Sequence, residues 1–205
     1  MLKVPGVLAE ASPAPLDPVF PTKALPKFLA CLTSCESPVL VDLGPVIPSN
    51  VSFFCEQLGC KVFVEDICAE VERHVRQGRR DALPEFLRAR FSRPAESVDG
   101  VLCWDVIDYL EKPAAQALAA ELMRVLRPNG ALLGSFGNLR EGKTHYTKYI
   151  VADEAHLRHR AYAATCGRQA SWPNRDIIRL FAGLRVSDSF LLKNNQREML
   201  FRKPA

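Results

Sequence analysis

Acidic side chains and a glycine follow two short apolar runs in the first half of the chain. The run Pro38–Leu43 is rich in β-branched residues and ends at Gly44, and the run Lys61–Val64 ends at Glu65 and Asp66. A glycine lets the backbone approach a ligand closely, and a carboxylate roughly twenty residues later can accept both hydroxyls of a ribose. This order and spacing favour a nucleoside site at the carboxyl ends of two strands. Each feature taken alone also fits a plain turn or a helix cap.

Groups that could move a proton lie further along the chain, in the segment GKTHYTKYIVADEAHLRHRAY. His145 and Tyr146 are the candidates for a general base toward a hydroxyl or a protonated amine, with Tyr149 close behind. The alternative for His145 is an exposed loop residue without a chemical role. Trp104 has two interpretations as well: its rigid face could stack on a ligand, or it could be a core residue that seals the cleft.

Short apolar strands alternate with helices as far as Phe136. The predicted strands are Pro38–Leu43, Lys61–Val64, a weak one near Phe91, Val98–Trp104 and Ala131–Phe136. The predicted helices are Lys23–Ser34, Ser49–Gly59, Ile67–Gln77, a short one around Leu83–Arg88, and a long one that opens at Lys112-Pro113 and ends near Arg127. Alternation of this kind implies right-handed crossovers and a parallel sheet with helices on both faces.

The two ends of the chain differ from this pattern. Residues 1–21 are interrupted by prolines and are predicted to be an irregular tail or a strap, which leaves 22–205 as one domain. An insertion at about 138–170 is predicted to be a helical cap over the site. The last elements predicted from the sequence are helices at Asp153–Ala164 and Asn174–Leu184 and strands at Val186–Lys193 and Arg197–Arg202. The turn between the two strands is tight, so they must be antiparallel to each other.

Four segments resemble class I S-adenosylmethionine-dependent methyltransferases of the type 11-like group: VLVDLGPVIPSN, GCKVFVEDI, SVDGVLCWDVIDYLEK and LMRVLRPNGALLGSFG. The resemblance covers Val39 to about Gly137 and, more loosely, the terminal strands. Its most distinctive part is a helix followed by R-x-L-K/R-P-x-G and a strand. It implies a Rossmann-like α/β fold, with a mostly parallel seven-stranded sheet, a C-terminal antiparallel hairpin and helices on both faces.

The resemblance also implies a cofactor, S-adenosyl-L-methionine, and a small-molecule or protein methyl acceptor. Asp42 and Gly44 match the acid and the first glycine of the family's loop. Asp66 matches the acid that binds the ribose, with Glu65 as its rival. The residues expected to bind the cofactor are Asp42, Gly44, Pro45, Val46, Asn50, Glu65, Asp66, Cys103, Trp104 and Asp105.

Two departures from the family pattern leave an alternative open. Val46 and Pro48 stand where the D-x-G-x-G-x-G loop has its second and third glycines, and no acid of a third strand is recognisable, although Asp81 and Glu85 are near. They favour a non-catalytic domain that keeps the fold as a binding or partner module. A nicotinamide-dependent oxidoreductase is a third possibility, but the chain lacks G-x-G-x-x-G.

The charge and the cysteine content argue against several kinds of partner. The net charge of +4 is spread along the chain, and no NPPY-like tetrapeptide follows the fourth strand, so a nucleic-acid partner is not expected. The seven cysteines are odd in number and include no C-x-x-C pair, which argues against a disulfide framework and a zinc site, and we expect no metal. The sequence shows no apolar run of membrane-spanning length and no secretory signal, so the expected location is the cytoplasm.

Overall fold

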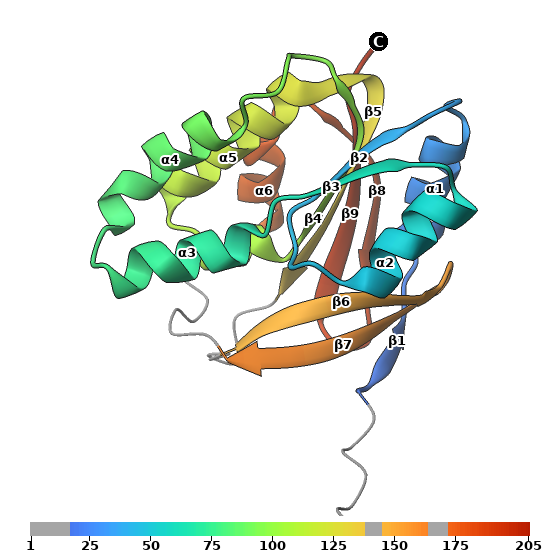
Figure 1. The fold of residues 1–205 in the computed structure, drawn as a ribbon, viewed down its shortest axis with the longest axis horizontal. Helices are drawn as coiled ribbons and strands as arrows, with labels where there is room; N and C mark the ends of the chain where they lie inside the picture. Colours follow the sequence, from blue (N-terminus) through green and yellow to red (C-terminus); the bar gives the residue numbers. More distant parts are fainter. Residues whose placement is uncertain (1–16, 138–144, 164–171) are drawn as a thin grey trace, which may run out of the picture.

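A six-stranded sheet forms the centre of the molecule, in the order β3-β2-β4-β5-β9-β8 (Figure 1). The computed structural model of the chain describes residues 17–137, 145–163 and 172–205. The strands of this sheet are β2 (Val39–Asp42), β3 (Lys61–Val64), β4 (Val98–Trp104), β5 (Leu126–Gly137), β8 (Arg185–Leu191) and β9 (Gln196–Arg202). β3, β2, β4 and β5 run parallel, whereas β9 is antiparallel to both β5 and β8.

Helices cover both faces of this sheet, because successive strand residues point to opposite sides. In β2, for example, Leu40 packs in the cluster that contains α1, and Val41 packs in the cluster that contains α3 to α6. The helices on the first side are α1 (Leu25–Thr33) and α2 (Pro48–Ser52), the latter continued by a π-helical turn at Phe53–Gln57. Those on the second side are α3 (Ile67–Arg76), α4 (Leu83–Arg90), α5 (Lys112–Val125) and α6 (Asn174–Leu180), with 3-10 turns at Arg80–Ala82 and Val106–Tyr109.

A second, three-stranded sheet lies across the carboxyl ends of the parallel strands (Figure 1). It consists of β1 (Val19–Pro21), β7 (His156–Ala163) and β6 (His145–Asp153), all antiparallel and in that order. In open parallel sheets ligands bind beyond the carboxyl ends of the strands, so this small sheet covers the edge where a site is expected.

The predicted α/β architecture is confirmed: a largely parallel sheet with helices on both faces and a C-terminal antiparallel hairpin. The expected strand near Phe91 is wrong, and the central sheet of the described residues has six strands rather than seven. The physical reason is that a side chain takes the place of a neighbouring strand. Arg124 of α5 donates hydrogen bonds to the carbonyl oxygens of Phe91, at 2.6 Å, and Arg93, at 2.9 Å.

The predicted helical cap is also wrong over residues 145–163, which form the β6–β7 hairpin. The segment from Asp153 contains good helix formers, but pairing with a distant strand outweighs this local preference. β6 pairs with β7 from His145 opposite Ala163 to Val151 opposite Leu157. At the N-terminal end, Val19–Pro21 pair with β7 as the strand β1, and residues 1–16 of the predicted tail or strap lie outside the described residues.

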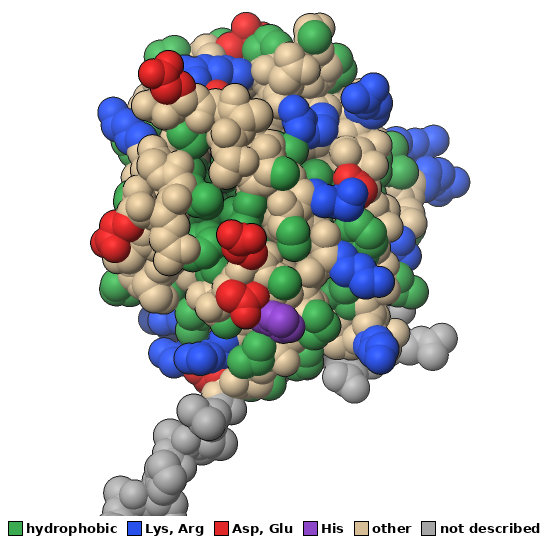
Figure 2. Space-filling view, turned by 90° about the vertical axis from the view of Figure 1, so that its right-hand side faces the viewer, with side chains coloured by type: hydrophobic (Ala, Val, Ile, Leu, Met, Phe, Trp, Pro, Cys, Tyr) green, Lys and Arg blue, Asp and Glu red, His purple; other side chains and the backbone are tan. Residues whose placement is uncertain are grey.

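Figure 2 shows the side of the molecule that carries α1 and α2, where Lys and Arg side chains are spread out with acidic side chains among them. Within the three described ranges, none of the helices combines the length and the apolar character needed to cross a lipid bilayer.

Candidate functional site

Asp42 ends β2 and lies buried beneath the turn at Gly44. Its Oδ1 atom accepts hydrogen bonds from the Gly44 backbone N–H at 2.8 Å and from the Trp104 Nε1–H at 2.7 Å. Burial raises the pKa of this carboxyl group from 3.8 to about 6. The two hydrogen bonds oppose the rise in pKa, and the nearby charge of Asp66 adds to it.

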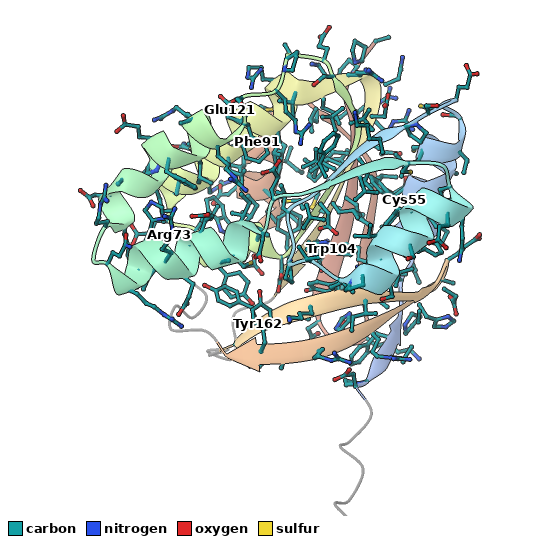
Figure 3. All side chains as sticks on the ribbon, in the orientation of Figure 1. Cys55, Arg73, Phe91, Trp104, Glu121 and Tyr162 are labelled. Atoms are coloured by element: carbon teal, nitrogen blue, oxygen red, sulfur yellow. The ribbon has the colours of Figure 1, made fainter. Side chains whose placement is uncertain are left out.

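Trp104, labelled in Figure 3, ends β4. Its indole lies directly against Gly44. A Cβ atom added to Gly44 would lie 3.0 Å from Cδ1 and 3.1 Å from Nε1 of the indole. On its other side the indole stacks on Tyr149 of β6, with ring centroids 5.0 Å apart and planes 3° apart. Only 4% of Trp104 is exposed, so in this structure the side chain seals the edge of the sheet.

An irregular backbone at the end of β4 directs the Trp104 side chain toward Gly44. The pairing of β4 with β5 shifts register between Leu102 and Trp104, and Trp104 has a φ angle of +47°. Bulges redirect side chains, and they are frequent beside functional sites. A bulky residue in the left-handed region is strained and needs surrounding contacts to stabilise it.

The two acids that follow β3 point to different partners. Glu65 forms ion pairs with Arg90 at 3.1 Å and with Arg93 at 3.3 Å. Asp66 caps α3 by accepting a hydrogen bond from the Ala69 backbone N–H through Oδ1. Because Glu65 is held by two guanidinium groups, Asp66 is the better candidate for a carboxylate that a ligand could reach.

The stretch after β4 provides two more buried carboxylates, Asp105 and Asp108. Asp105 accepts a hydrogen bond from the Tyr109 hydroxyl at 3.3 Å, and its charge contributes to the raised pKa of the Cys68 thiol, whose main cause is burial. Cys103 lies in the core that packs against α3 to α6, and burial raises its pKa strongly. Asp42, Asp66 and Asp105 therefore lie at the carboxyl ends of three adjacent parallel strands.

Asn50 is turned toward β6 and not toward the glycine turn. Its Nδ2 donates to the Tyr149 carbonyl oxygen and its Oδ1 accepts from the Val151 N–H, both at 2.8 Å. β6 is an edge strand, so the Asn50 amide takes the place of a neighbouring strand there. Pro45 is partly buried in the turn, and Val46 is 63% exposed.

Two of the cavities that described residues line lie at this edge. A cavity of about 480 Å³ runs between α3 and the β6–β7 hairpin, and one of about 10 Å³ lies between Trp104, Tyr149 and β9. The smaller has room for about one water molecule, whereas the larger is of ligand size. The residues that line the larger cavity are Cys68, Ala69, Glu72, Arg73, Arg76, Gln77, Tyr146 and Tyr162.

The two candidate bases lie at the start of β6. Tyr146 is buried beside Tyr109 and Tyr162, and its hydroxyl donates a long hydrogen bond of 3.5 Å to Glu72. The backbone carbonyl oxygen of His145 accepts from the Tyr109 hydroxyl at 3.1 Å, and its side chain is partly buried. In the parts of the chain that are described, no cluster of His, Cys, Asp or Glu could hold a metal ion.

The structure brings some of the predicted residues together and separates others. Asp42, Gly44 and Trp104 are in contact, and Asp66 is close to Asp42, whereas Asn50 and Glu65 have other partners. Tyr162 and Cys68 were not among the predicted site residues. Tyr162 was not recognised because a helix was predicted where β7 forms. No pattern in the sequence indicated that Arg90 and Arg93 would pair with Glu65.

Comparison with known proteins agrees with this fold. Residues 41–134 match the family described as methyltransferase domain. The structure is similar to 1,6-didemethyltoxoflavin-N1-methyltransferase from Burkholderia thailandensis, solved with 1,6-didemethyltoxoflavin and S-adenosylhomocysteine, with a TM-score of 0.52 and 16% identity over 89% of this chain and 79% of that one. It is also similar to the PH0226 protein from Pyrococcus horikoshii OT3, with a TM-score of 0.51 and 18% identity over 82% of each chain.

A third similar structure, the [4+2]-cyclase SpnF, has a TM-score of 0.52 and 10% identity over 89% of this chain and 81% of that one. Comparison with curated proteins gives no sequence match. Identities this low show a shared fold, and the cyclase illustrates that the fold alone does not determine the reaction. Residues 41–134, which carry β2 to β5 and most of the candidate site, are therefore similar to the methyltransferase-domain family, and the chain shares the fold of the solved structures that it resembles.

Proposed function

We propose that the chain binds S-adenosylmethionine at the carboxyl ends of β2, β3 and β4 and transfers its methyl group to a small-molecule or protein acceptor. The observation that carries this proposal is the pair of carboxylates beside the Gly44 turn. Asp42 and Asp66 are near each other, and neither pairs with a Lys or Arg among the described residues. A ligand that offers hydroxyl groups and positive charge would compensate them.

The residues fit the two halves of such a cofactor differently. On the side of β3, the Asp66 carboxylate uses Oδ1 for the helix cap, and its second oxygen can accept ribose hydroxyls. On the side of β2, the indole of Trp104 occupies the space against Gly44. The nucleoside half therefore fits as the structure stands, and the amino-acid half fits once this indole has turned away.

The cofactor would supply a methyl group on a sulfonium leaving group, and the protein positions the acceptor and excludes water. The cavity beside Tyr146 and Tyr162 is the place that we assign to the acceptor. The β6–β7 hairpin covers this edge, and we assign it the task of limiting access of water to the acceptor. His145 and Tyr146 remain our candidates for accepting a proton from the acceptor, and Tyr146 lines the cavity directly.

One observation favours the alternative function, a non-catalytic domain that binds a partner. The atoms that would meet the cofactor near Gly44 already have partners within the chain, since Trp104 donates to Asp42 and covers the glycine. The two functions differ in a simple measurement, because the non-binding form of this alternative gives no heat with S-adenosylhomocysteine even at millimolar concentration. We expect a cytoplasmic location with either function.

Asp66→Asn should weaken binding of S-adenosylhomocysteine about tenfold with little change in melting temperature. Asparagine keeps the oxygen that caps α3, so the helix is retained. It removes the charge that strengthens hydrogen bonds to ribose hydroxyls, and a tenfold loss of affinity corresponds to about 1.4 kcal/mol. Isothermal titration calorimetry and thermal melting measure the two quantities on the same preparation.

Glu65→Gln is the matched comparison, because the two acids are adjacent. Its ion pairs with Arg90 and Arg93 hold it away from the ligand, so affinity should stay within about twofold. If Glu65→Gln lowers the affinity and Asp66→Asn does not, the assignment of the ribose-binding acid is reversed.

A further inference from the structure

Trp104 has three contacts that together hold its indole in one place. Nε1 donates to Asp42 Oδ1 at 2.7 Å, one face stacks on Tyr149, and an edge lies against Gly44. The φ angle of +47° is strained for a bulky residue, so these contacts stabilise a conformation that the backbone alone disfavours. A side chain under such strain can have a second position once its partners are replaced.

Tyr149, the platform on which the indole stacks, is held by hydrogen bonds to its side chain and to its backbone. The Tyr149 hydroxyl accepts a hydrogen bond from Gln196 Nε2 at 2.7 Å, and its carbonyl oxygen accepts from Asn50 Nδ2. The free volume on this side of Trp104 is about 10 Å³, too little for the indole to move deeper. It can leave Gly44 only by turning out of the stack.

Gly44 and Asp42 are the groups that a ligand would need on this side. A ligand that approaches the Gly44 backbone must take the space of the indole, because even a single added carbon there would be 3.0 Å from Trp104. A ligand with an ammonium group also offers N–H donors, which can replace the Nε1–H at the Asp42 carboxylate. A nucleoside without the amino-acid end has no ammonium group to place against Asp42.

We propose that Trp104 is a gate: its indole closes the Gly44 side of the site in the free protein, and the amino-acid end of an adenosyl ligand displaces it. This inference rests on the proposed function. It has a direct thermodynamic consequence. A protein that binds only in its open form shows an affinity reduced by the open fraction, so removal of the indole raises the affinity.

The first test compares two ligands on wild type and Trp104→Leu. Leucine keeps an apolar side chain but removes the ring and its N–H group. S-adenosylhomocysteine, which has the ammonium group, should bind Trp104→Leu at least about tenfold more tightly than wild type. 5′-Methylthioadenosine, which lacks the amino-acid end, should bind both proteins equally. Trp172→Phe, which changes the other tryptophan of the chain, is the control and should bind both ligands as wild type does.

The second test observes the indole itself and does not depend on the stability of Trp104→Leu. In Trp172→Phe protein, Trp104 is the only tryptophan. Because it is buried, its fluorescence should be blue-shifted and poorly quenched by acrylamide. Saturation with S-adenosylhomocysteine should shift the emission to the red and increase quenching, and 5′-methylthioadenosine should leave both unchanged.

The outcomes separate the gate from the proposed function. If wild type binds S-adenosylhomocysteine but folded Trp104→Leu binds it no more tightly, the gate is wrong and the proposed function stands. Unchanged fluorescence of Trp104 at saturation also overturns the gate alone. If no protein of the set binds either ligand at millimolar concentration, both proposals fail.

Discussion

Asn50→Ala is expected to lower the free energy of unfolding by about 2–4 kcal/mol. The side chain is 2% exposed and makes hydrogen bonds of 2.8 Å to the Tyr149 carbonyl oxygen and the Val151 N–H. Alanine would leave both main-chain groups of this buried strand edge without these partners, and each unsatisfied group costs about 1–3 kcal/mol. Urea unfolding measures the effect directly.

The same substitution should loosen the platform under Trp104. Tyr149 is held in register by the Asn50 amide, so the stack between Tyr149 and Trp104 should become less ordered. Near-ultraviolet circular dichroism of the aromatic side chains reports this change. Ser49→Ala, an exposed position in the same helix, is the matched control and should change stability by less than about 0.5 kcal/mol. Equal stability of the two variants would contradict the role given to Asn50.

Asp42→Asn should stabilise the protein at neutral pH, although it removes a charged group from a predicted site. The pKa of Asp42 is raised from 3.8 to about 6 in the folded state, chiefly by burial. The folded protein therefore binds more protons than the unfolded chain between these values, and its stability falls as pH rises from about 4 to about 6. Asparagine keeps an oxygen acceptor for the Gly44 and Trp104 N–H groups and avoids the buried charge.

The gain should therefore depend on pH in a defined way. Near pH 4 the wild-type group is protonated when folded, so Asp42→Asn should differ little from wild type. Above about pH 7 the difference should reach its plateau, of the order of 2–3 kcal/mol in favour of the variant. Unfolding by urea at pH 4, 6 and 8 gives the profile. A gain of equal size at all three values would show that the buried charge is not its source.

The sequence could predict the features that depend on neighbouring residues, and it could not predict those that depend on residues far apart in the chain. β2 was recognisable because a continuous run of apolar, β-branched residues is typical of a strand buried on both faces. The C-terminal hairpin was recognisable because a tight turn forces its strands to be antiparallel. Both features are local, and both are confirmed.

The elements that were mispredicted depend on distant partners. β7 has the composition of a helix, and its pairing with β6 and β1 decides its conformation. The residues near Phe91 were predicted to be a strand but form a loop. The guanidinium group of Arg124 donates a hydrogen bond to the Phe91 carbonyl oxygen, which a neighbouring strand would otherwise bind. Neither partner can be identified from the local sequence.

In the candidate site, too, the local features could be predicted and the contacts between distant residues could not. The sequence placed Asp42, Gly44 and Asp66 at the carboxyl edge of the sheet, because strand ends and glycine turns are local features. The direction of Trp104 could not be predicted, since it depends on a register shift and a positive φ angle. The partner of Asn50 is a strand about 100 residues away in the chain.

A crystal structure of the wild-type protein grown with S-adenosylhomocysteine tests the central claim most directly. We expect density for the adenosyl compound with its ribose at the Asp66 carboxylate and its amino-acid end against Gly44, where the indole of Trp104 now lies. The indole should then have left Gly44 and the ring of Tyr149. An indole that still covers Gly44 in crystals grown at millimolar ligand, with no adenosyl compound beside Asp66, would show that the proposed cofactor does not bind at this edge of the sheet.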